Sequence, residues 1–412
     1  LAIDTIFKLA QEYNIECGLK RSKAYFYAVK PEDIVRLEKE FITCEHAGID
    51  VNYIEAAPLP FKTYGSICYN NQGQFNPRQY LLTLAKSIPD SNGSAIYENS
   101  VALEIKEVKK NGNSDKNYEV ITDKGVIRAK KVIVATHFPF PYKGLFFAKM
   151  KVCRSYVLGI RIADELPEEL FYSSTDPYYY IRTHQDSKGK LVIVGGEDHV
   201  TAEERNTLEC YQSIKKFAEN HFNVQSIDYS WSTQDNYTFD ELPYIGKVSK
   251  DNPNLYVATG FNGSGMIYGT LSGVIIADLI EGNNDYSYYQ DFYDPSRLNI
   301  LDTGKDLFSR NLHVAEMYVG DRLSSMNKVN SLDKIAAGSG SIAHINGKDL
   351  AVYRDDDNKI YALSPVCRHL GCRLRYNEAE RSWDCPCHGS RYGVDGNILH
   401  GPALKTLEKY KI

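Results

Sequence analysis

Two short loops near the C-terminal end of the sequence each combine a cysteine with a histidine. Cys367 and His369 form the first pair, and Cys385 and His388 form the second after the intervening residues 370–384. Two thiolates and two imidazoles can bind a [2Fe–2S] cluster, in which the cysteines hold one iron and the histidines hold the other. The same four donors can also bind a structural zinc ion in tetrahedral geometry.

The arrangement of these donors favours the iron–sulfur cluster over zinc. Structural zinc sites usually begin with a closely spaced pair of cysteines, whereas each loop here mixes cysteine with histidine. The loops also contain Gly371, Gly389 and Ser390, small residues that let the backbone approach a ligand closely. Zinc and unligated thiols remain the alternatives.

The pattern Cys-x-His-x-Gly-Cys followed by Cys-x-Cys-His-Gly-Ser resembles the Rieske domains of cytochrome bc complexes. The resemblance implies a [2Fe–2S] cluster with four ligands: Cys367, His369, Cys385 and His388. It also implies a disulfide that would join the two loops through Cys372 and Cys387. Ser390 would donate a hydrogen bond to a bridging sulfide and Tyr392 to a ligating cysteine. Gly401-Pro402 would cover the cluster, although a Gly-Pro pair also marks an ordinary turn.

This ligand set predicts a comparatively high reduction potential. Neutral histidines in place of anionic thiolates lower the negative charge of the cluster and place its potential between about −150 and +300 mV. Hydrogen bonds to the sulfur atoms raise the potential further. With both hydroxyls present, we expect a potential in the upper half of that range.

The composition is that of a globular protein with more than one domain. The chain has 412 residues, of which 43% are hydrophobic and 25% are charged, and this length is expected to form two or three domains. A net charge of −5 gives no basic stripe, so we expect no nucleic-acid partner. The cysteines outside the two loops are scattered singly and are expected to be buried thiols: Cys17, Cys44, Cys68, Cys153 and Cys210.

Hydrophobic periodicity predicts alternating helices and strands before residue 300. Helices are expected over 1–13, 31–46, 77–85 and 203–222, the third with Asn76 as its N-cap. Strands are expected over 102–105, 118–121, 125–127, 157–162, 178–182 and 191–194, with a turn at 111–113. The apolar run 131–137 is typical of a parallel strand buried on both faces, and the polar stretch 231–246 is expected to be a loop.

A strand, a glycine-rich turn and a helix are expected over residues 255–280. This window carries few charges, but its glycines together with Asn262, Ser264 and Ser272 argue against a membrane span. A strand that leads through glycines into a helix can place the helix N-terminus against an anionic or carbonyl-rich ligand. Taken alone, the glycine pattern is also compatible with an ordinary turn.

The order of several short motifs resembles the D-amino-acid oxidase/glycine oxidase family of flavoproteins. These motifs are Ala-Thr at 135–136, Tyr-x-Arg at 180–182, Gly-Gly at 195–196, Leu-Pro-Tyr-Ile-Gly at 242–246 and Ala-Thr-Gly at 258–260. The closing Tyr-Asp-Pro-Ser-Arg at 293–297 is similar to the end of the flavin domain in the bacterial subgroup that carries a C-terminal Rieske module. The resemblance covers essentially the whole chain.

The resemblance implies FAD as a second cofactor. Ala102 would contact the adenine through its backbone, and three residues would lie along the dinucleotide: Ala135, Thr136 and His137. Backbone amides would face the ribityl and pyrimidine ends of the flavin at Gly263, Gly265, Met266 and Ile267. Tyr180 and Arg182 are candidates to bind substrate, because arginine can clamp a carboxylate with two hydrogen bonds. Arg182 could equally be a solvated strand residue, and His137 a packed loop residue.

One motif of that family is absent. The Gly-x-Gly-x-x-Gly turn that binds the FAD pyrophosphate occurs nowhere in the sequence, which begins within a predicted helix. We therefore expect a chain that lacks an N-terminal βαβ unit and binds FAD weakly or not at all. The expected fold is an incomplete α/β FAD-binding oxidoreductase domain with a mixed-sheet substrate region over 1–303. A linker helix over 304–327 and an all-β Rieske domain over 328–412 would follow, with hairpin turns at 346–347 and 395–396.

Together these features predict a flavin- and cluster-dependent oxidoreductase. A small amine or amino acid would be oxidised by hydride transfer to FAD, and the cluster would relay single electrons between the flavin and an unidentified acceptor or donor. One alternative is a non-catalytic electron carrier or redox sensor, favoured by Gln234-Asp235 where related oxidases tend to have Arg-Pro. Another is an amine oxidase that uses O2 directly and keeps the cluster for structure. We expect a cytoplasmic protein without a membrane span.

Overall fold

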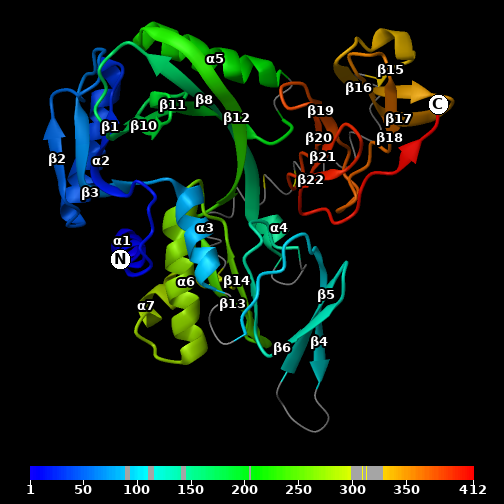
Figure 1. Ribbon diagram of the computed structural model, residues 1–412, viewed down its shortest axis with the longest axis horizontal. Helices are drawn as coiled ribbons and strands as arrows, with labels where there is room; N and C mark the ends of the chain where they lie inside the picture. The colour runs from blue at the N-terminus through cyan, green and yellow to red at the C-terminus, as the bar shows by residue number, and fades with distance from the viewer. Residues whose placement is uncertain are drawn as a thin grey trace. The chain divides into compact units, whose positions relative to one another are not determined.

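The computed structural model describes residues 1–88, 93–109, 116–140, 145–203, 206–297, 309, 312 and 328–412 (Figure 1). The expected turn at 111–113 and nearly all of the expected linker helix at 304–327 lie outside the described residues. The chain divides into two compact units. The first comprises Leu1–Ile96, Arg154–His199 and Leu208–Thr233, and the second comprises Tyr97–Cys153, Val200–Thr207 and Gln234–Ile412.

The helices lie close to where apolar periodicity and capping residues predict them. Asn76 caps the third helix by accepting hydrogen bonds from the backbone amides of Arg78 and Gln79 at 3.1 and 3.2 Å. A 3-10 turn, η1 (Pro31–Asp33), leads into the second. The α-helices are α1 (Ala2–Glu12), α2 (Ile34–His46), α3 (Pro77–Ser87), α4 (Phe146–Lys149), α5 (Thr207–His221), α6 (Gly265–Glu281) and α7 (Ser287–Phe292).

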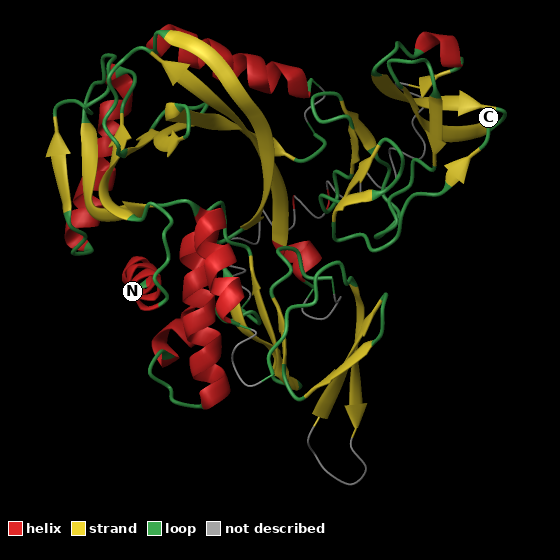
Figure 2. Cartoon of the chain, in the orientation of Figure 1, coloured by secondary structure: helices red, strands yellow, loops and turns green. Residues whose placement is uncertain are grey.

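An eight-stranded sheet, most of which belongs to the first unit, carries α5 on one face (Figure 2). In spatial order its strands are β12 (Val224–Thr238), β8 (Met150–Ile162), β11 (Gly189–Val200), β10 (Tyr179–Asp186), β9 (Leu170–Ser173), β1 (Lys20–Tyr27), β3 (Ser66–Gln74) and β2 (Val51–Ile54). Strands β1 and β9 are parallel. Ile181 and Val192 pack with Ile214 of α5 in the core. Because side chains alternate along a strand, Tyr180 and Arg182 lie on the opposite face of β10.

The second unit begins with a smaller α/β part. Strands β13 (Tyr244–Ser249), β14 (Asn252–Thr259) and β7 (Val132–Val134) form a sheet in which β14 and β7 are parallel, and α6 packs against β13 and β14. A separate antiparallel meander contains β4 (Ala102–Lys109), β5 (Lys116–Thr122) and β6 (Val126–Ala129). Tyr118 of the meander is fully buried in the same apolar cluster as Val134 and Phe138.

Residues 328–412 form an all-β part with two sheets. The first sheet contains β15 (Lys328–Val329), β16 (Ser339–Ile345), β17 (Lys348–Arg354), β18 (Ile360–Leu363) and β23 (Lys409–Tyr410), with the 3-10 turn η2 (Leu332–Lys334) after β15. The second contains β19 (Arg375–Asn377), β20 (Ser382–Asp384), β21 (Arg391–Gly393) and β22 (Ile398–His400). Both expected hairpin turns are present, because 346–347 joins β16 to β17 and 395–396 joins β21 to β22.

The predicted α/β fold followed by an all-β domain is confirmed, but two local predictions are wrong. Residues 231–238 continue strand β12 instead of forming a loop, because Gln234, Asn236 and Thr238 are buried at alternate positions. The run 131–137 forms a short parallel strand, yet Ile133 is 48% exposed, so among the described residues the strand is not buried on both faces. Among the scattered cysteines, Cys153 is half-buried, and four are buried: Cys17, Cys44, Cys68 and Cys210.

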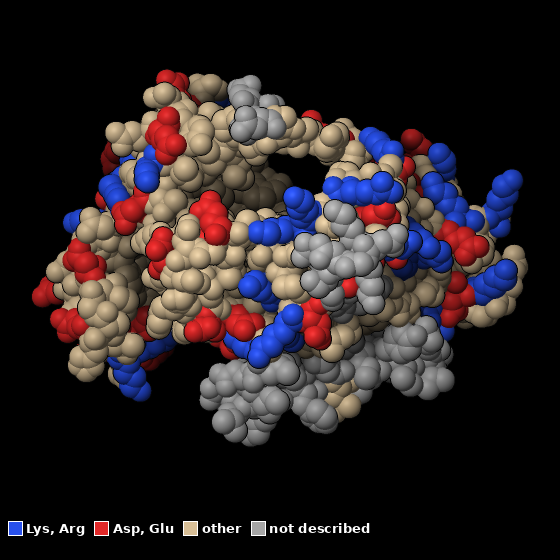
Figure 3. Space-filling model, turned by 90° about the horizontal axis from the view of Figure 1, so that it is seen from below, with Lys and Arg blue, Asp and Glu red and all other residues tan. Residues whose placement is uncertain are grey.

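The described part of the chain contains no helix long and apolar enough to cross a membrane. On the face drawn in Figure 3, acidic and basic side chains are interspersed. Neither sign forms a continuous stripe among the described residues of that face.

Replacing Asn76 by Ala should fray the first turn of α3. The Asn76 side chain satisfies two backbone amides, so the change should cost about 1 kcal/mol of local stability. Hydrogen exchange measured by mass spectrometry should become faster in α3 alone. Asn76→Asp keeps the accepting oxygen and should preserve protection, whereas unchanged exchange in Asn76→Ala would contradict the capping role.

Candidate redox centre

The two Cys/His loops have the same local construction. The first follows β18, and Cys367 donates its amide to Cys372 (2.8 Å) while accepting from Gly371 (3.1 Å). The second follows β20, where Cys385 donates to Ser390 (2.8 Å) and accepts from Gly389 (3.0 Å). Gly371 and Gly389 have φ of +82° and +72°, values that residues with a Cβ rarely adopt. Each glycine therefore closes a tight turn around its cysteine.

These turns bring two thiols and two imidazoles together. Cys367 and Cys385 are free thiols and are 2% and 1% exposed. The rings of His369 and His388 lie 5.0 Å apart, nearly perpendicular to each other. Two thiols beside two imidazoles form the donor set that a [2Fe–2S] cluster of this type requires.

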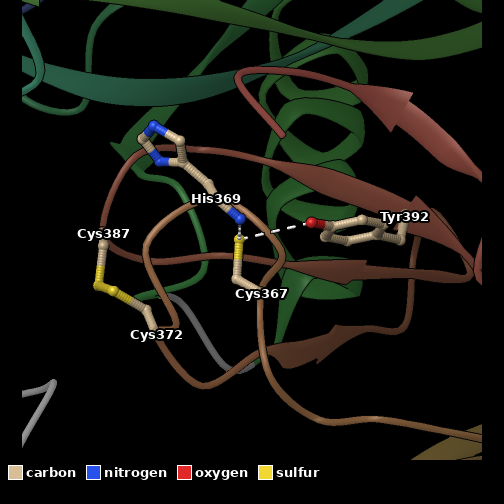
Figure 4. The surroundings of a disulfide bond; sticks show 5 residues. All are labelled: Cys367, His369, Cys372, Cys387 and Tyr392. Carbon is tan, nitrogen blue, oxygen red and sulfur yellow. Dashed lines mark hydrogen bonds between the residues drawn. A yellow bond between two sulfur atoms is a disulfide. The ribbon is translucent and has the colours of Figure 1, made fainter. Parts of the chain in front are cut away.

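The other two cysteines of the loops are joined by a disulfide (Figure 4). Cys372 and Cys387 have Cα atoms 6.5 Å apart, and the bond ties the loops together. The sulfur of Cys385 lies within 4.8 Å of both disulfide sulfurs. Since Cys372 and Cys387 are bonded to each other, Cys385 is the member of this sulfur group that can offer a thiolate.

Hydrogen-bond donors surround Cys367. The hydroxyl of the fully buried Tyr392 lies 3.5 Å from its sulfur and accepts from the amide of Arg368 at 3.0 Å (Figure 4). Hydrogen bonds from Cys385, and then from Tyr392, the His369 amide and Ser390, outweigh burial and lower the pKa of Cys367 to about 6. This favours the thiolate, which is the form that binds metals.

Two phenylalanines cover the histidine pair. Phe138 packs edge-on against both rings, with centroid distances of 6.5 Å to His369 and 6.4 Å to His388. Phe147 packs against His388 at 5.7 Å. Burial lowers the pKa of His369 to about 4, so the ring is neutral and able to ligate a metal at neutral pH.

The expected FAD segments meet at one edge of the β13-β14-β7 sheet. Because β7 and β14 are parallel, residues 135–137 and 260–265 leave the sheet at the same end. Thr259 and Asn236 donate to the carbonyl of His137 at 2.5 and 2.8 Å. These contacts hold Ala135, Thr136 and His137 beside the start of α6.

The N-terminus of α6 fits a bound carbonyl-rich or anionic group. The first helical hydrogen bond is donated by Tyr268 to Ser264 at 3.0 Å, and no side chain caps this terminus. The amides before Tyr268 therefore have no partner within the helix, namely those of Gly265, Met266 and Ile267. A Cβ at Gly265 would meet no atom within 4 Å, and Gly263 has φ +79°, so the turn leaves room in front of these amides.

Two of the residues expected to bind FAD make contacts away from the N-terminus of α6. Ala102 begins β4 in the separate meander, and no described contact joins it to the α6 edge. His137 has φ +61°, and its Nδ1 lies 3.3 Å from Nε2 of His400 in the all-β part. Burial and the charge of His400 lower the pKa of His137 to about 4. His137 therefore belongs to the contact with the all-β part.

The candidate substrate residues belong to the first unit. Arg182 lines a cavity of about 630 Å³, whose wall also includes Lys20, Gln74 and Phe75. One guanidinium nitrogen of Arg182 is 3.5 Å from the carbonyl of Phe75, and its buried Nε has no hydrogen-bond partner among the described residues. Tyr180 is outside that wall and packs over Gly195, where a Cβ would lie 2.2 Å from its ring.

Sequence reasoning did not identify several residues that contact the cluster loops or adjoin them. Phe138, Phe147 and His400 gave no motif signal, because their partners lie far away in the chain. Gln234 stood out as a departure from Arg-Pro, and the structure gives it a contact: its Nε2 donates to the carbonyl of Gly389 at 2.9 Å. Alternating polar residues at 234, 236 and 238 were the available signal for a buried strand.

Comparison with known proteins decides the family. Residues 1–279 match the model of the family described as FAD dependent oxidoreductase, and residues 325–411 match the Rieske [2Fe-2S] domain. The Bacillus subtilis (strain 168) protein YhfW, named for its Rieske 2Fe-2S character, is 32% identical over 410 residues, which are 99% of this chain and 78% of that protein. The chain belongs to the FAD-dependent oxidoreductase family and carries a C-terminal Rieske domain. Its cofactors are FAD and a [2Fe–2S] cluster.

Solved structures of an oxidase and a dehydrogenase share the fold. Glycine oxidase from Geobacillus kaustophilus is 19% identical, with 72% of this chain and 80% of that chain covered at a TM-score of 0.58. L-proline dehydrogenase from P. horikoshii is 18% identical, with 72% and 81% covered at the same TM-score.

The cytochrome b6-f complex iron-sulfur subunit of Chlorobaculum tepidum is 34% identical over 95 residues, which are 21% of this chain and 51% of that subunit.

Removing the disulfide should destabilise the Rieske domain of the oxidoreductase. The bond closes a segment of 15 residues, so the double change Cys372→Ala and Cys387→Ala should cost about 3 kcal/mol of unfolding free energy. Loss of the cluster absorbance in guanidinium chloride should occur at a lower midpoint. Cys153→Ala, which removes a thiol outside the loops, is the control; equal midpoints for both proteins would contradict the stabilising role.

Proposed function

We propose that this FAD-dependent oxidoreductase oxidises a small amine or amino acid and passes the electrons one at a time through its cluster to an external acceptor. The main support for this proposal is the position of the loop that follows β7. This loop lies beside the N-terminus of α6, and its Phe138 packs on His369 and His388. The candidate sites of both cofactors thus share one short segment of backbone, a contact that a purely structural cluster would not need.

In this proposal Cys367 and Cys385 bind one iron, and His369 and His388 bind the other. The adjacent, buried and reduced sulfurs support the first assignment. The short distance between the two imidazoles and the lowered pKa of His369 support the second. Tyr392 donates to Cys367, and Ser390 donates within the same site. The Rieske domain occupies 328–412 and follows a linker at 304–327 and the FAD domain at 1–303.

In this proposal the residues of the chain bind and orient the flavin and shield the cluster from water. When bound, FAD accepts a hydride from the carbon next to the substrate nitrogen, and the [2Fe–2S] cluster accepts single electrons. The free amides at the start of α6 hold the pyrimidine end of the flavin, while Ala135 and Thr136 lie along the dinucleotide. Phe138 and Phe147 keep water away from the histidine side of the cluster.

Arg182 is the proposed carboxylate clamp for the substrate. Arg182 lines a cavity of about 630 Å³, and its Nη2 makes only a long contact of 3.5 Å with the carbonyl of Phe75, so the guanidinium could bind a carboxylate there. The glycine oxidase and L-proline dehydrogenase of the comparison are named for amino-acid substrates, which supports the same class here. Tyr180 lies on the same face of β10 as Arg182 but outside the wall of that cavity, and it is proposed only as a neighbouring substrate contact.

Anaerobic mixing of the full-length, FAD-loaded enzyme with a panel of amines and amino acids tests the function. Flavin reduction followed by bleaching of the cluster supports the relay. Flavin reduction without bleaching, with fast reoxidation by O2, would instead establish a direct oxidase with a structural cluster. No flavin reduction by any member of the panel would count against the proposal and support the electron-carrier alternative.

Arg182→Lys should weaken binding of carboxylate substrates. Lysine keeps the charge but loses the planar pair of donors, so KM should rise about tenfold or more with a smaller change in kcat. Steady-state kinetics with the best amino acid of the panel measures the effect. Arg128→Lys, at a residue whose side chain is 84% exposed, should leave KM unchanged. An equal KM for Arg182→Lys would contradict the clamp.

Tyr392→Phe should lower the reduction potential of the cluster. The change removes a hydroxyl 3.5 Å from the Cys367 sulfur, and a hydrogen bond of about 1.4 kcal/mol corresponds to about 60 mV for one electron. Spectroelectrochemical titration of the purified enzyme measures the potential. Tyr361→Phe, on β18 of the same domain, is the control; an unshifted Tyr392→Phe midpoint would refute the role.

A further inference from the structure

The C-terminal end of strand β12 carries buried polar side chains on one of its faces. Gln234, Asn236 and Thr238 are 8%, 1% and 3% exposed. Alternate residues of a strand point to the same side, so these three face one region of the second unit. Buried polar groups persist where they are hydrogen-bonded, and the partners of this row therefore indicate what the strand holds.

Gln234 holds the cluster loops. Its Nε2 donates to the carbonyl of Gly389 at 2.9 Å and lies 3.1 Å from Nδ1 of His400. Its Oε1 accepts from the hydroxyl of the buried Thr201 at 3.2 Å, which fixes the orientation of the amide. Gly389 immediately follows His388, so the glutamine clamps the second cluster loop directly.

The contact leaves no space between the loop and the FAD domain. A Cβ at Gly389 would lie 2.6 Å from Val152 and 2.9 Å from Gln234 Nε2. Farther along the boundary, the buried hydroxyl of Thr207 donates to Asn377 at 2.8 Å and accepts from the amide of Ala379 at 3.0 Å. The two domains therefore meet through several desolvated hydrogen bonds.

The next residues of the same strand hold the FAD loops. Asn236 donates to the carbonyl of His137 at 2.8 Å, and its own carbonyl accepts from the amide of Asn262 at 3.1 Å. The amide of Thr238 donates to the side chain of Asn262 at 2.9 Å. Both segments that leave the edge of the β14-β7 pair are thus tied to β12.

We propose that β12 acts as a fixed spacer, in which Gln234 keeps the Rieske domain docked with its histidine side toward the FAD loops. This inference rests on the electron relay proposed above. Gln234 is a positioning residue, since it acts through Gly389 and His400. Cys367, His369, Cys385 and His388 would hold the cluster, which would accept one electron at a time, so two successive transfers with release of the flavin protons to solvent would reoxidise one reduced flavin. A one-electron oxidant such as ferricyanide then restores the cluster from outside.

Docking through Gln234 has a consequence for the external partner. Phe138 covers the two histidines from the FAD domain, and His388 is 6% exposed. Electrons from the flavin would therefore enter the cluster on the side of His369 and His388. The external acceptor would approach another side of the Rieske domain.

Gln234→Glu tests the spacer because it keeps the shape and replaces both donor hydrogens with a carboxylate oxygen. A carboxylate facing the buried carbonyl of Gly389 should weaken docking enough to slow electron transfer about tenfold or more. The flavin of the FAD- and cluster-loaded enzyme is reduced by a light flash under anaerobic conditions with EDTA as the sacrificial electron donor, and cluster bleaching is followed by absorbance. Hydrogen exchange of residues 385–390 should become faster, while the EPR spectrum of the chemically reduced cluster should not change.

Gln225→Glu is the matched control. Gln225 is exposed on the same strand, so transfer rate and exchange should equal those of the unmodified enzyme. Gln234→Met, which removes both polar ends at nearly constant size, replaces Gln234→Glu if the latter loses its cluster. Unchanged transfer and exchange in these Gln234 variants would overturn the spacer. Absence of flavin-to-cluster transfer in the unmodified enzyme would instead overturn the relay itself.

Discussion

The structure depends on one constraint, which is that two loops from different strands must meet with their sulfur and nitrogen donors pointing inward. Regular sheet pairing does not supply this contact, since the donors lie between strands. A covalent bond between Cys372 and Cys387 joins the loops, and a glycine in the left-handed region closes each of them. Trp383 and Tyr392 then pack around the sulfurs in one apolar core.

Desolvation gives this centre its chemical character. The packing around His369 lowers the pKa of its ring, which favours the neutral form that can ligate a metal. The cost of burying polar groups is offset by hydrogen bonds along the boundary with the FAD domain, where Gln234, Thr207 and Asn377 are all paired. The same boundary therefore excludes water from the histidine rings and fixes the position of the Rieske domain against the FAD domain.

Local features of the sequence were predictable, and long-range contacts were not. Cys367 to Tyr392 is one short stretch, so the spacing of its residues was enough to predict a Rieske domain and the disulfide between its two loops. Asn76 is similar, because a cap acts on amides only two and three residues away. By contrast, Gln234 and Gly389 are 155 positions apart, and no periodicity connects them. The roles of Ala102, Tyr180 and Arg182 come from family resemblance and stay predictions.

The close fit of Gly389 against Val152 and Gln234 bears on how such two-module enzymes arise. Fusing a Rieske gene to an oxidase gene would place the two domains on one polypeptide without aligning them. Strand β12 of the recipient would also have to present a neutral amide at the position of Gln234, and the incoming loop would have to keep a residue without a side chain at the position of Gly389. Horizontal exchange of Rieske modules between such oxidases should therefore leave paired substitutions at these two positions.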